Sequence, residues 1–271
     1  MGDLYLTAGY GNSKHASAVL QLLIQQGHTV HGVILYKMSA KRVIAYVKRL
    51  GRFRAASRYA SRGLGLGRAG RQDPEVEPVL KFMEKCGLSS EGVSAVASTL
   101  GVPVLPVRSF SDEQLLAKMR SHPVDAVVYC GGGIVRGDLI GIPRIGILNA
   151  HAGPLPEFRG MNASEWSVIH GVEPVVTTMI IDEGIDTGDI VAVHAIEGIP
   201  ARSVGELRGL ATVASIKALV ADIDRLLGGT VKPREQMGKG DQYFTMANEL
   251  VEVLNTRLER GSTLMSQDKH V

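Results

Sequence analysis

The chain has 271 residues, of which 45% are hydrophobic and 21% are charged. These proportions exclude a disordered or fibrous protein, and the length allows one substantial core with at most a small appendage. The net charge of +3 is unevenly distributed, because residues 41–71 hold ten of the 30 Lys and Arg and no acid, which leaves 20 bases against 27 acids, or −7, elsewhere. We therefore distinguish an acidic body from a basic arm.

The longest apolar stretches, residues 142–152 and 175–181, are too short and too often broken by polar residues to cross a bilayer. The first residues have no basic segment before their apolar run, so they predict a strand and not a signal peptide. We expect no transmembrane segment and a cytoplasmic location. Cys86 and Cys130 lack the spacing of metal ligands, and we expect both to be buried, with no disulfide, metal or nucleophilic role.

The first 35 residues follow a strand, loop, helix, strand order. Residues 4–8 predict a buried strand, apolar residues then recur at helical spacing from Ala16 until Gly27 caps the helix, and residues 30–35 predict a second strand. Because parallel strands require crossover connections that are usually helical, this order predicts an α/β fold with a doubly wound, mostly parallel sheet.

The rest of the chain continues this alternation and ends in helices. A helix is predicted to start at Ser111 and to run to about Ser121, with Asp112 and Glu113 in its first turn. Further helices are predicted over residues 76–83, 91–100, 203–227 and 243–260, and further strands over residues 102–107, 125–130, 145–151, 177–182 and 189–196.

Asn149 and His151 lie two residues apart on a predicted strand, so their side chains leave the same face. Gly153 and Pro154 then end the strand, which places both residues at its carboxyl end, where open α/β sheets bind ligands. A single histidine on a buried strand is more often a core residue with a satisfied hydrogen bond. An amide on the same face makes burial costly unless both groups are paired or hydrated, so we favour a functional site.

Two spaced motifs include or follow this strand. The first contains Asn149, His151 and residues 155–160, Leu-Pro-Glu-Phe-Arg-Gly; the second is Asp-x-Gly-x-Asp-Thr-Gly at residues 182–188. Together they resemble the folate-dependent formyltransferases, a family that includes glycinamide ribonucleotide, methionyl-tRNA and sugar N-formyltransferases. The order of elements agrees with this family over about residues 4–193. The resemblance implies its Rossmann-like fold, with a catalytic domain over residues 1–200 and a helical extension over residues 201–271.

By position, the resemblance places the catalytic trio of the family at Asn149, His151 and Asp186. Attack of an amine on a formamide carbon produces a tetrahedral oxyanion, which needs hydrogen-bond donors already in place. Asn149 and a protonated His151 supply such donors. His151 also suits the proton transfers of the reaction, with Asp186 orienting or charging it. Taken alone, Asp186 is more typical of a turn residue before Thr187 and Gly188.

The resemblance further implies that the formyl carrier is 10-formyltetrahydrofolate, whose pterin is held by two loops. The corresponding residues are Gly133, Ile134, Val135 and Arg136 in one loop, and Glu183, Gly184 and Ile185 before Asp186 in the other. The apolar pair Ile134 and Val135 suits a flat ring, and core packing explains it equally well. Residues 152–154, Ala-Gly-Pro, lack the hydroxyl that many family members have after the histidine. Residues 131–133 are less bulky than usual, which predicts a wider folate pocket or a more mobile strand end.

The amine acceptor is less clearly indicated. The 85 residues after Asp186 leave no room for the tRNA-binding barrel of the methionyl-tRNA enzymes, so we expect none. Residues 9–13 resemble the phosphate-binding turn of the glycinamide ribonucleotide enzymes, whereas residues 242–246 resemble the tail of sugar N-formyltransferases. We favour an amino sugar on a nucleoside diphosphate, with glycinamide ribonucleotide or another small amine as the alternative. The candidate acceptor-binding residues are Gly11, Asn12, Ser13, Arg159 and Trp166.

Some features keep more than one interpretation. The basic arm is a solvated helix or binds a diphosphate, an anionic membrane or RNA. Trp166 stacks on the acceptor or is an ordinary core residue. A dinucleotide-dependent oxidoreductase is weakly indicated by Gly9 and Gly11, because the third glycine of that fingerprint is absent. A non-catalytic relative that binds RNA or membranes would not need the trio. We also expect a homodimer through the C-terminal helices.

Overall fold

The computed structural model of the protein describes residues 1–37, 73–122 and 124–260. The basic arm predicted over residues 41–71 therefore lies outside the described residues. Within the described ranges, no helix combines the length and the apolar composition that a membrane span requires.

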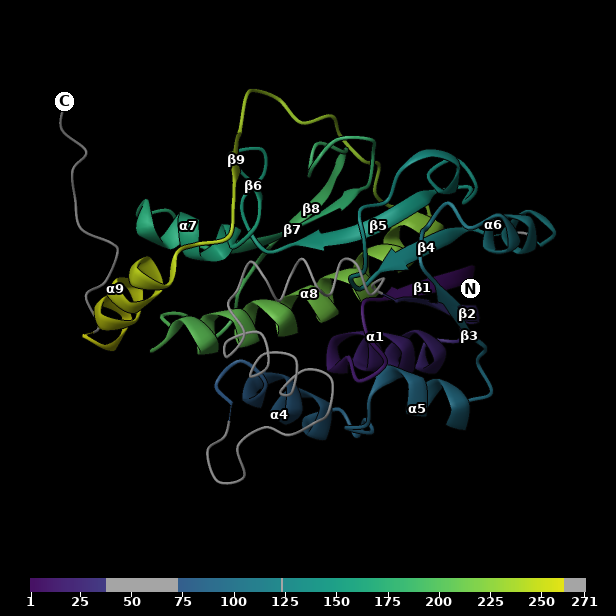
Figure 1. Ribbon diagram of the computed structural model, residues 1–271, viewed down its shortest axis with the longest axis horizontal. Helices are drawn as coiled ribbons and strands as arrows, with labels where there is room; N and C mark the ends of the chain where they lie inside the picture. The colour runs from purple at the N-terminus through teal and green to yellow at the C-terminus, as the bar shows by residue number, and fades with distance from the viewer. Residues whose placement is uncertain (38–72, 123, 261–271) are drawn as a thin grey trace. The chain divides into compact units, whose positions relative to one another are not determined.

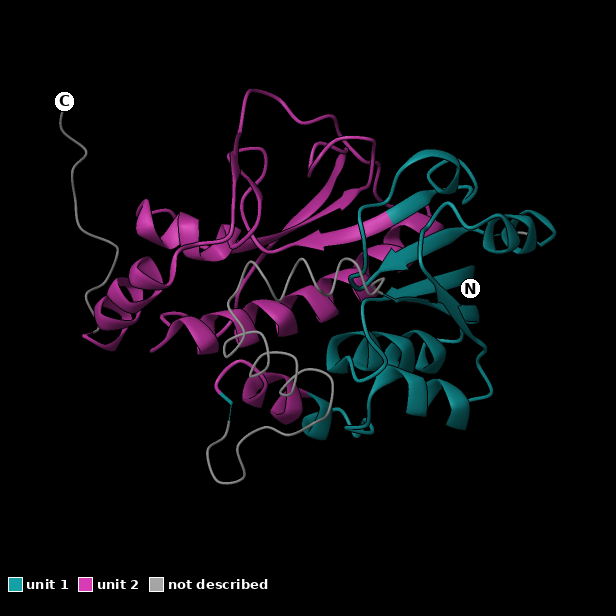
Figure 2. Cartoon of the chain, viewed as in Figure 1, with its two compact units in different colours: residues 1–73, 83–147 teal, residues 74–82, 148–271 magenta. Residues whose placement is uncertain are grey.

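The chain divides into two compact units, which Figure 2 shows in different colours. Unit 1 comprises residues 1–73 and 83–147, and unit 2 comprises residues 74–82 and 148–271. The boundary after residue 200 between a catalytic domain and an extension stays a prediction.

Unit 1 holds the parallel strands and the helices that connect them. Its strands are β1 (Asp3–Ala8), β2 (Thr29–Tyr36), β3 (Val104–Val107), β4 (Ala126–Tyr129) and the start of β5 (Gly146–His151); its helices are α1 (Lys14–Gln25), α5 (Val93–Thr99), α6 (Glu113–Arg120) and the short 3₁₀ helix η1 (Gly137–Leu139). β1 pairs in parallel with β2 and β4, and β2 pairs in parallel with β3. The strands are largely apolar and buried, as expected where both faces of a sheet are covered.

Unit 2 holds the antiparallel strands and the C-terminal helices. Its elements are most of α4 (Glu77–Lys85), the end of β5, β6 (Phe158–Gly160), α7 (Ala163–Ile169), β7 (Val175–Ile180), β8 (Ile190–Ala195), α8 (Val204–Leu227), β9 (Asp241–Tyr243) and α9 (Asn248–Glu259). β7 pairs in antiparallel fashion with β5 and with β8. β6 and β9 form a separate two-stranded parallel sheet.

The strand order of the main sheet is β3-β2-β1-β4-β5-β7-β8. The described pairings on its β3 side are parallel and those on its β8 side are antiparallel. The prediction of a mostly parallel α/β sheet with a C-terminal helical extension is therefore confirmed.

The structure corrects two predicted element boundaries. Asp112, not Ser111, caps α6, because its carboxylate accepts hydrogen bonds from the main-chain N–H of Gln114 and Leu115. The last helix begins at Asn248 and not at Tyr243, which is the last residue of β9. The side chain of Tyr243 packs on other aromatic rings, a tertiary contact that helical periodicity does not reveal.

Four elements were not predicted from the sequence: η1, β6, α7 and β9. The two strands and η1 have three residues each, too few to show a hydrophobic period, and α7 has seven. The expectation that both cysteines are buried is wrong for Cys86, which is exposed, whereas Cys130 is buried. Cys86 directly follows the last residue of α4 and lies in a turn.

The core of unit 2 lies between α8 and the antiparallel strands. Figure 1 shows α8 running along β7 and β8, and small residues on the helix allow the close approach. The hydrophobic cluster at this contact contains Val176, Ile196, Ala211, Ala214 and Ala218. Ser203 caps the helix by accepting a hydrogen bond from the N–H of Glu206.

One carboxylate is wholly buried in this core. Asp222 of α8 is 0% exposed and accepts hydrogen bonds from Thr178 Oγ1 at 2.6 Å and Arg225 Nη1 at 2.8 Å, and His194 Nε2 lies 2.6 Å from it. Burial by itself raises the pKa of Asp222, but the hydrogen bonds from His194 and Thr178, the charge of His194 and the Arg225 bond outweigh it and lower the pKa. These partners satisfy a group that would otherwise be costly to bury.

We predict that Asp222→Asn lowers the free energy of unfolding at pH 7 by about 3 kcal/mol, because a neutral amide replaces the buried carboxylate to which Thr178, His194 and Arg225 are bound. The depressed pKa makes the carboxylate stabilising above the unfolded-state pKa, and this contribution is lost as the pH falls below about 4. Urea unfolding of both proteins across this pH range should therefore give converging stabilities in acid. The matched control is Asp138→Asn, in an exposed ion pair with Arg120 at 3.8 Å, for which we expect under about 0.5 kcal/mol. Equal losses in both variants would contradict the prediction.

Candidate active site

The end of β5 carries two of the predicted catalytic residues. Asn149 pairs with Met179 and His151 with Thr177 across the β5–β7 ladder, so both side chains leave the same face of the strand. His151 is 7% exposed, and Asn149 is half-buried. Among the described residues, no group hydrogen-bonds the Asn149 amide. A half-buried amide without a protein partner fits a site that receives a polar ligand atom.

Both ring nitrogens of His151 face polar groups of the protein. Nε2 lies 2.6 Å from the carbonyl oxygen of Phe158, and Nδ1 lies 3.5 Å from Asp186 Oδ2. A carbonyl oxygen only accepts, so Nε2 carries the hydrogen of this bond. Nδ1 donates to Asp186 only when it is protonated as well, which makes the ring a cation. The geometry therefore suits a charged imidazole that is held between a carbonyl and a carboxylate.

Asp186 projects from a tight loop between β7 and β8. Asp182 Oδ1 organises the loop by accepting hydrogen bonds from Gly184 N at 3.0 Å and Thr187 Oγ1 at 2.6 Å. Asp186 has a φ of 53°, a left-handed conformation that Asp tolerates better than most residues. Gly188 passes so close to the Ile180 carbonyl that a Cβ would lie 1.7 Å from that oxygen. The fixed residues of the motif Asp-x-Gly-x-Asp-Thr-Gly are thus residues on which the conformation of this one loop depends.

Two segments outside this loop hold Asp186. Gly160 N of β6 donates to the carboxylate oxygen Oδ2 at 2.8 Å, and Gln236 Nε2 donates to the main-chain oxygen of Asp186 at 2.9 Å. Sequence reasoning did not predict roles for the Phe158 carbonyl, the Gly160 N–H or Gln236. The first two act through main-chain atoms, and Gln236 lies in a segment without a recognisable pattern, so no side-chain signal marks them.

The other predicted site residues of unit 2 lie around this network. Arg159 Nη2 donates to Gln236 Oε1 at 2.9 Å, while its buried Nε has no hydrogen-bond partner among the described residues. Trp166 is half-buried, and its indole N–H donates to the Phe244 carbonyl at 2.9 Å. Residues 183–185 form the exposed to half-buried rim of the Asp186 loop.

The predicted site residues of unit 1 lie at the carboxyl ends of β1 and β4. Of the two apolar residues assigned to the pterin, Ile134 is 62% exposed and Val135 is 5% exposed, so they do not form one surface. Ser13 caps α1 by accepting from Ala16 N at 3.2 Å. The Gly11 carbonyl accepts from the N–H of Ser94 at 3.0 Å, which ties the predicted phosphate turn to the start of α5.

The glycines at residues 131–133 do not leave an open space on this side of unit 1. A Cβ on Gly132 would lie 2.8 Å from the Phe110 ring, and a Cβ on Gly133 would lie 2.7 Å from the Tyr36 ring. These two rings pack together with a centroid distance of 5.5 Å. The aromatic side chains thus use the room that the glycines leave, and the expectation of a wider folate pocket is not supported here.

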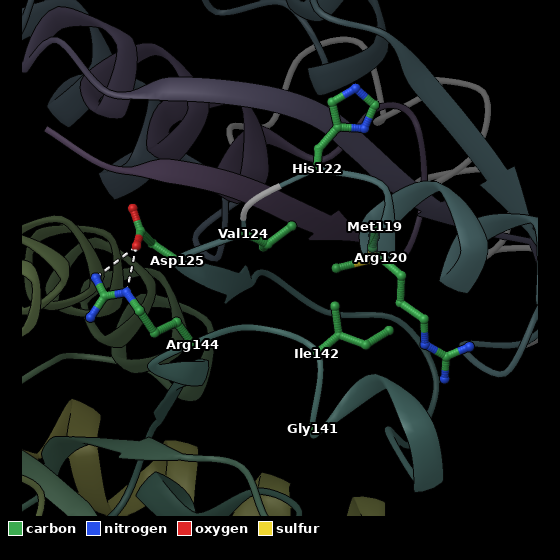
Figure 3. Close-up of a pocket in the computed structure, with 8 residues that line it drawn as sticks. All are labelled: Met119, Arg120, His122, Val124, Asp125, Gly141, Ile142 and Arg144. Atoms are coloured by element: carbon green, nitrogen blue, oxygen red, sulfur yellow. Dashed lines mark hydrogen bonds and ion pairs between the residues drawn. The ribbon is translucent and has the colours of Figure 1, made fainter.

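Unit 1 also has a hollow of about 460 Å³, drawn in Figure 3, between the end of α6 and the start of β4. The Arg144 guanidinium donates twice to Asp125 Oδ1 on its wall, at 2.8 and 2.6 Å. The pKa of Asp125 is lowered by the hydrogen bond from the Asp3 N–H and, against the effect of burial, by Arg144. The hollow lies at the amino end of β4 and contains none of the predicted site residues.

The described residues contain no group of three or more His, Cys, Asp or Glu side chains arranged to hold a metal ion. What they bring together is an imidazole and a carboxylate, with the carboxylate held by a main-chain N–H and with an amide two residues before the imidazole on the same face of β5. Such an arrangement can donate hydrogen bonds to a developing oxyanion and move a proton.

We predict that Gly160→Ala destabilises the protein more than Gly171→Ala. Both glycines have a positive φ, so both substitutions carry the strain of about 1 kcal/mol expected for a left-handed alanine. Only at Gly160 would the new Cβ also collide with the chain, 2.2 Å from the Tyr243 carbonyl oxygen, whereas Gly171 faces open space. Denaturant unfolding should show that the free energy of unfolding falls by about 2 kcal/mol more for Gly160→Ala than for Gly171→Ala. Equal losses would mean that β9 does not press against β6.

The methionyl-tRNA formyltransferase of Lachnospira eligens is 32% identical over 151 residues, which are 55% of this chain and 48% of the relative. That of Thermodesulfovibrio yellowstonii is 31% identical over 154 residues, 56% of this chain and 50% of the relative. The chain therefore spans about half the length of the curated relatives it matches.

Solved structures show the same fold at low identity. Glycinamide ribonucleotide transformylase 1 from Symbiobacterium toebii has a TM-score of 0.57 at 17% identity, covering 87% of this chain and 95% of that chain. A sugar N-formyltransferase from a Shewanella species has a TM-score of 0.56 at 14% identity, covering 95% of this chain and 87% of that chain. The family model described as formyl transferase matches residues 6–223, most of the chain. The chain thus belongs to the formyl transferase family.

Proposed function

We propose that the protein transfers a formyl group from 10-formyltetrahydrofolate to a primary amine. The observation that carries this proposal is the 3.5 Å approach of His151 Nδ1 to Asp186 Oδ2, at the end of a strand whose Asn149 amide no described residue binds, in a chain of the formyl transferase family. A carbonyl substrate requires hydrogen-bond donors that the protein does not already use, and such sites lie at the ends of sheet strands.

In this proposal Asn149 and His151 stabilise the oxyanion that forms when the amine attacks the formyl carbon. No residue in the described part of the chain binds the Asn149 amide, so it is available to donate to the reacting oxygen. His151 Nε2 donates to the Phe158 carbonyl in this structure, so His151 must exchange that bond for one to the reacting oxygen. The exchange costs little if the new acceptor carries more negative charge than a carbonyl, because charge-assisted hydrogen bonds are stronger.

His151 is also the proposed proton carrier. When the ring is protonated, it can give a proton to the folate nitrogen that leaves the formyl carbon and then take one from the amine nitrogen that has attacked, so a single imidazole serves both transfers and returns to its starting state. The Asp186 carboxylate, 3.5 Å from Nδ1, is proposed to fix the orientation of the ring. The carrier would contact the loop from Gly133 to Arg136 and the loop from Glu183 to Ile185.

For the acceptor we favour an amino sugar attached to a nucleoside diphosphate. The turn with Gly11, Asn12 and Ser13 and the residues Arg159 and Trp166 are the proposed contacts. The fold shared with a sugar N-formyltransferase supports this class, and so does the sequence of the tail. The predicted homodimer and the cytoplasmic location belong to the same proposal.

A second acceptor class is favoured by a specific observation. The sequence relatives are methionyl-tRNA formyltransferases, and the match covers about half of each of the first two. Methionyl-tRNA is therefore the alternative acceptor, and glycinamide ribonucleotide is a third, because enzymes of that name share the fold. A non-catalytic relative that binds RNA or membranes through residues 41–71 is the alternative of another class.

We predict that Asn149→Ala and His151→Ala each lower kcat by about 10²- to 10⁴-fold, because each removes a donor or a proton carrier from the transition state. The dissociation constant for tetrahydrofolate should change by less than about threefold, since the lost interactions form mainly in the transition state. The readouts are the absorbance change that accompanies release of tetrahydrofolate and calorimetric binding. His122→Ala, an exposed histidine of unit 1, is the control and should keep full activity. Full activity in both site variants would end the proposal.

The acceptor class is tested by a panel of amines. Purified protein with 10-formyltetrahydrofolate should formylate a nucleoside diphosphate amino sugar with a higher kcat/KM than glycinamide ribonucleotide or methionyl-tRNA, because the proposed contacts hold a diphosphate and a sugar. Formylated product is measured by mass spectrometry. Faster turnover of either other acceptor would reassign the substrate, and no turnover of any acceptor would favour the non-catalytic alternative.

A further inference from the structure

The segment between α8 and α9 contacts the candidate active site in two places. Its strand β9 pairs with β6, the strand that contributes the Phe158 carbonyl and the Gly160 N–H to the site. The Tyr243 ring stacks on the Phe158 ring with a centroid distance of 5.2 Å. The second contact is made by Gln236, earlier in the same segment. This segment lies beyond residues 6–223, the part that matches the family.

Three of the four hydrogen bonds that the Gln236 amide can form are directed at the site. Its Nε2 donates to the main-chain oxygen of Asp186 at 2.9 Å and to that of Gly188 at 2.7 Å. Its Oε1 accepts from Arg159 Nη2 at 2.9 Å. One amide therefore connects the Asp186 loop to β6. A primary amide is the side chain that offers two donors and an acceptor on one plane.

The hydrogen bonds from Gly160 and Gln236 hold different parts of Asp186. Gly160 N binds the carboxylate, whereas Gln236 binds the main-chain oxygen of the same residue. Asp186 has a left-handed φ of 53°, a conformation that costs free energy and persists only when its surroundings enforce it. Fixing the carbonyl fixes the direction in which the carboxylate leaves the main chain, and with it the distance to His151.

We propose that Gln236 is a positioning residue that holds the Asp186 carboxylate against His151. The proposal rests on the proposed function, in which Asp186 orients and charges that histidine. Gln236 touches no reacting atom. It acts by keeping the loop in the conformation that the hydrogen bond from Gly160 requires.

The Gly160 amide reports directly on this geometry, because its hydrogen bonds to Asp186 Oδ2. We predict that Gln236→Ala speeds hydrogen exchange of the Gly160 amide by about tenfold or more, measured by ¹H–¹⁵N NMR, because the carboxylate leaves its place. The same variant should lower kcat of formyl transfer by about tenfold to a hundredfold, with the folate KM little changed. Gln236→Glu keeps the size of the side chain and the acceptor for Arg159, but it places a carboxylate oxygen against the main-chain oxygens of Asp186 and Gly188. It should therefore show the same faster exchange and the same lower kcat.

Gln242→Glu is the matched control, the same change at an exposed position of β9, and it should leave exchange and kcat as in the wild type. The amide of Ile216 in α8 monitors opening of the whole unit. The proposal is overturned if Gly160 exchange is unchanged in both Gln236 variants, or if Ile216 exchange accelerates equally, which would indicate a general loss of stability. Wild-type protein that transfers no formyl group would refute the proposed function, while the Gly160 amide would still decide whether Gln236 positions Asp186.

Discussion

The carboxylate oxygen Oδ2 of Asp186 accepts the Gly160 N–H at 2.8 Å and lies 3.5 Å from His151 Nδ1. Through this atom the loop between β7 and β8, the short strand β6 and the end of β5 are connected. The same strand β6 also supplies the carbonyl that accepts from His151 Nε2. The position of β6 therefore determines both the carbonyl that contacts His151 Nε2 and the N–H that holds the Asp186 carboxylate near Nδ1. Contacts that hold β6 in place also hold the candidate site in place.

Unit 2 contains a second His–Asp pair, and the comparison shows what separates a structural pair from a candidate catalytic one. Asp222 is fully buried, lies 2.6 Å from His194, and also accepts from Thr178 and Arg225, so both of its oxygens have partners. Asp186 has a longer contact to its histidine, and the Asn149 amide on the strand of that histidine is bound by no described residue. Three partners rigidify the first pair, whereas the unused donors of Asn149 are available to a ligand.

The sequence predicts the side chains of the site better than their support. Strand periodicity places Asn149 and His151 on one face, whereas Asp186 is assigned by the resemblance to the formyltransferases, because taken alone it is more typical of a turn residue. The positions around Asp186 do have local requirements, such as the close approach of Gly188 to Ile180. The contacts from Phe158 and Gly160 use main-chain atoms, which any residue possesses. Their positions depend on the pairing of β6 with β9, a long-range contact between two three-residue strands that no local pattern reveals.

The pairing of β6 with β9 also bears on how members of one family differ. The trio lies within the residues that match the family model, whereas Gln236 and β9 lie beyond them. Chemistry shared by a family depends on groups that meet the reacting atoms, and these are constrained wherever the reaction is the same. The residues that position these groups need only the right geometry, not a particular chemistry. A different segment of a different family member can therefore supply them. In this protein that segment also packs Tyr243 against Trp166, a proposed acceptor contact, with a centroid distance of 5.2 Å. One segment thus contacts both the candidate site and Trp166, the proposed acceptor contact, so a change in this segment would act on both.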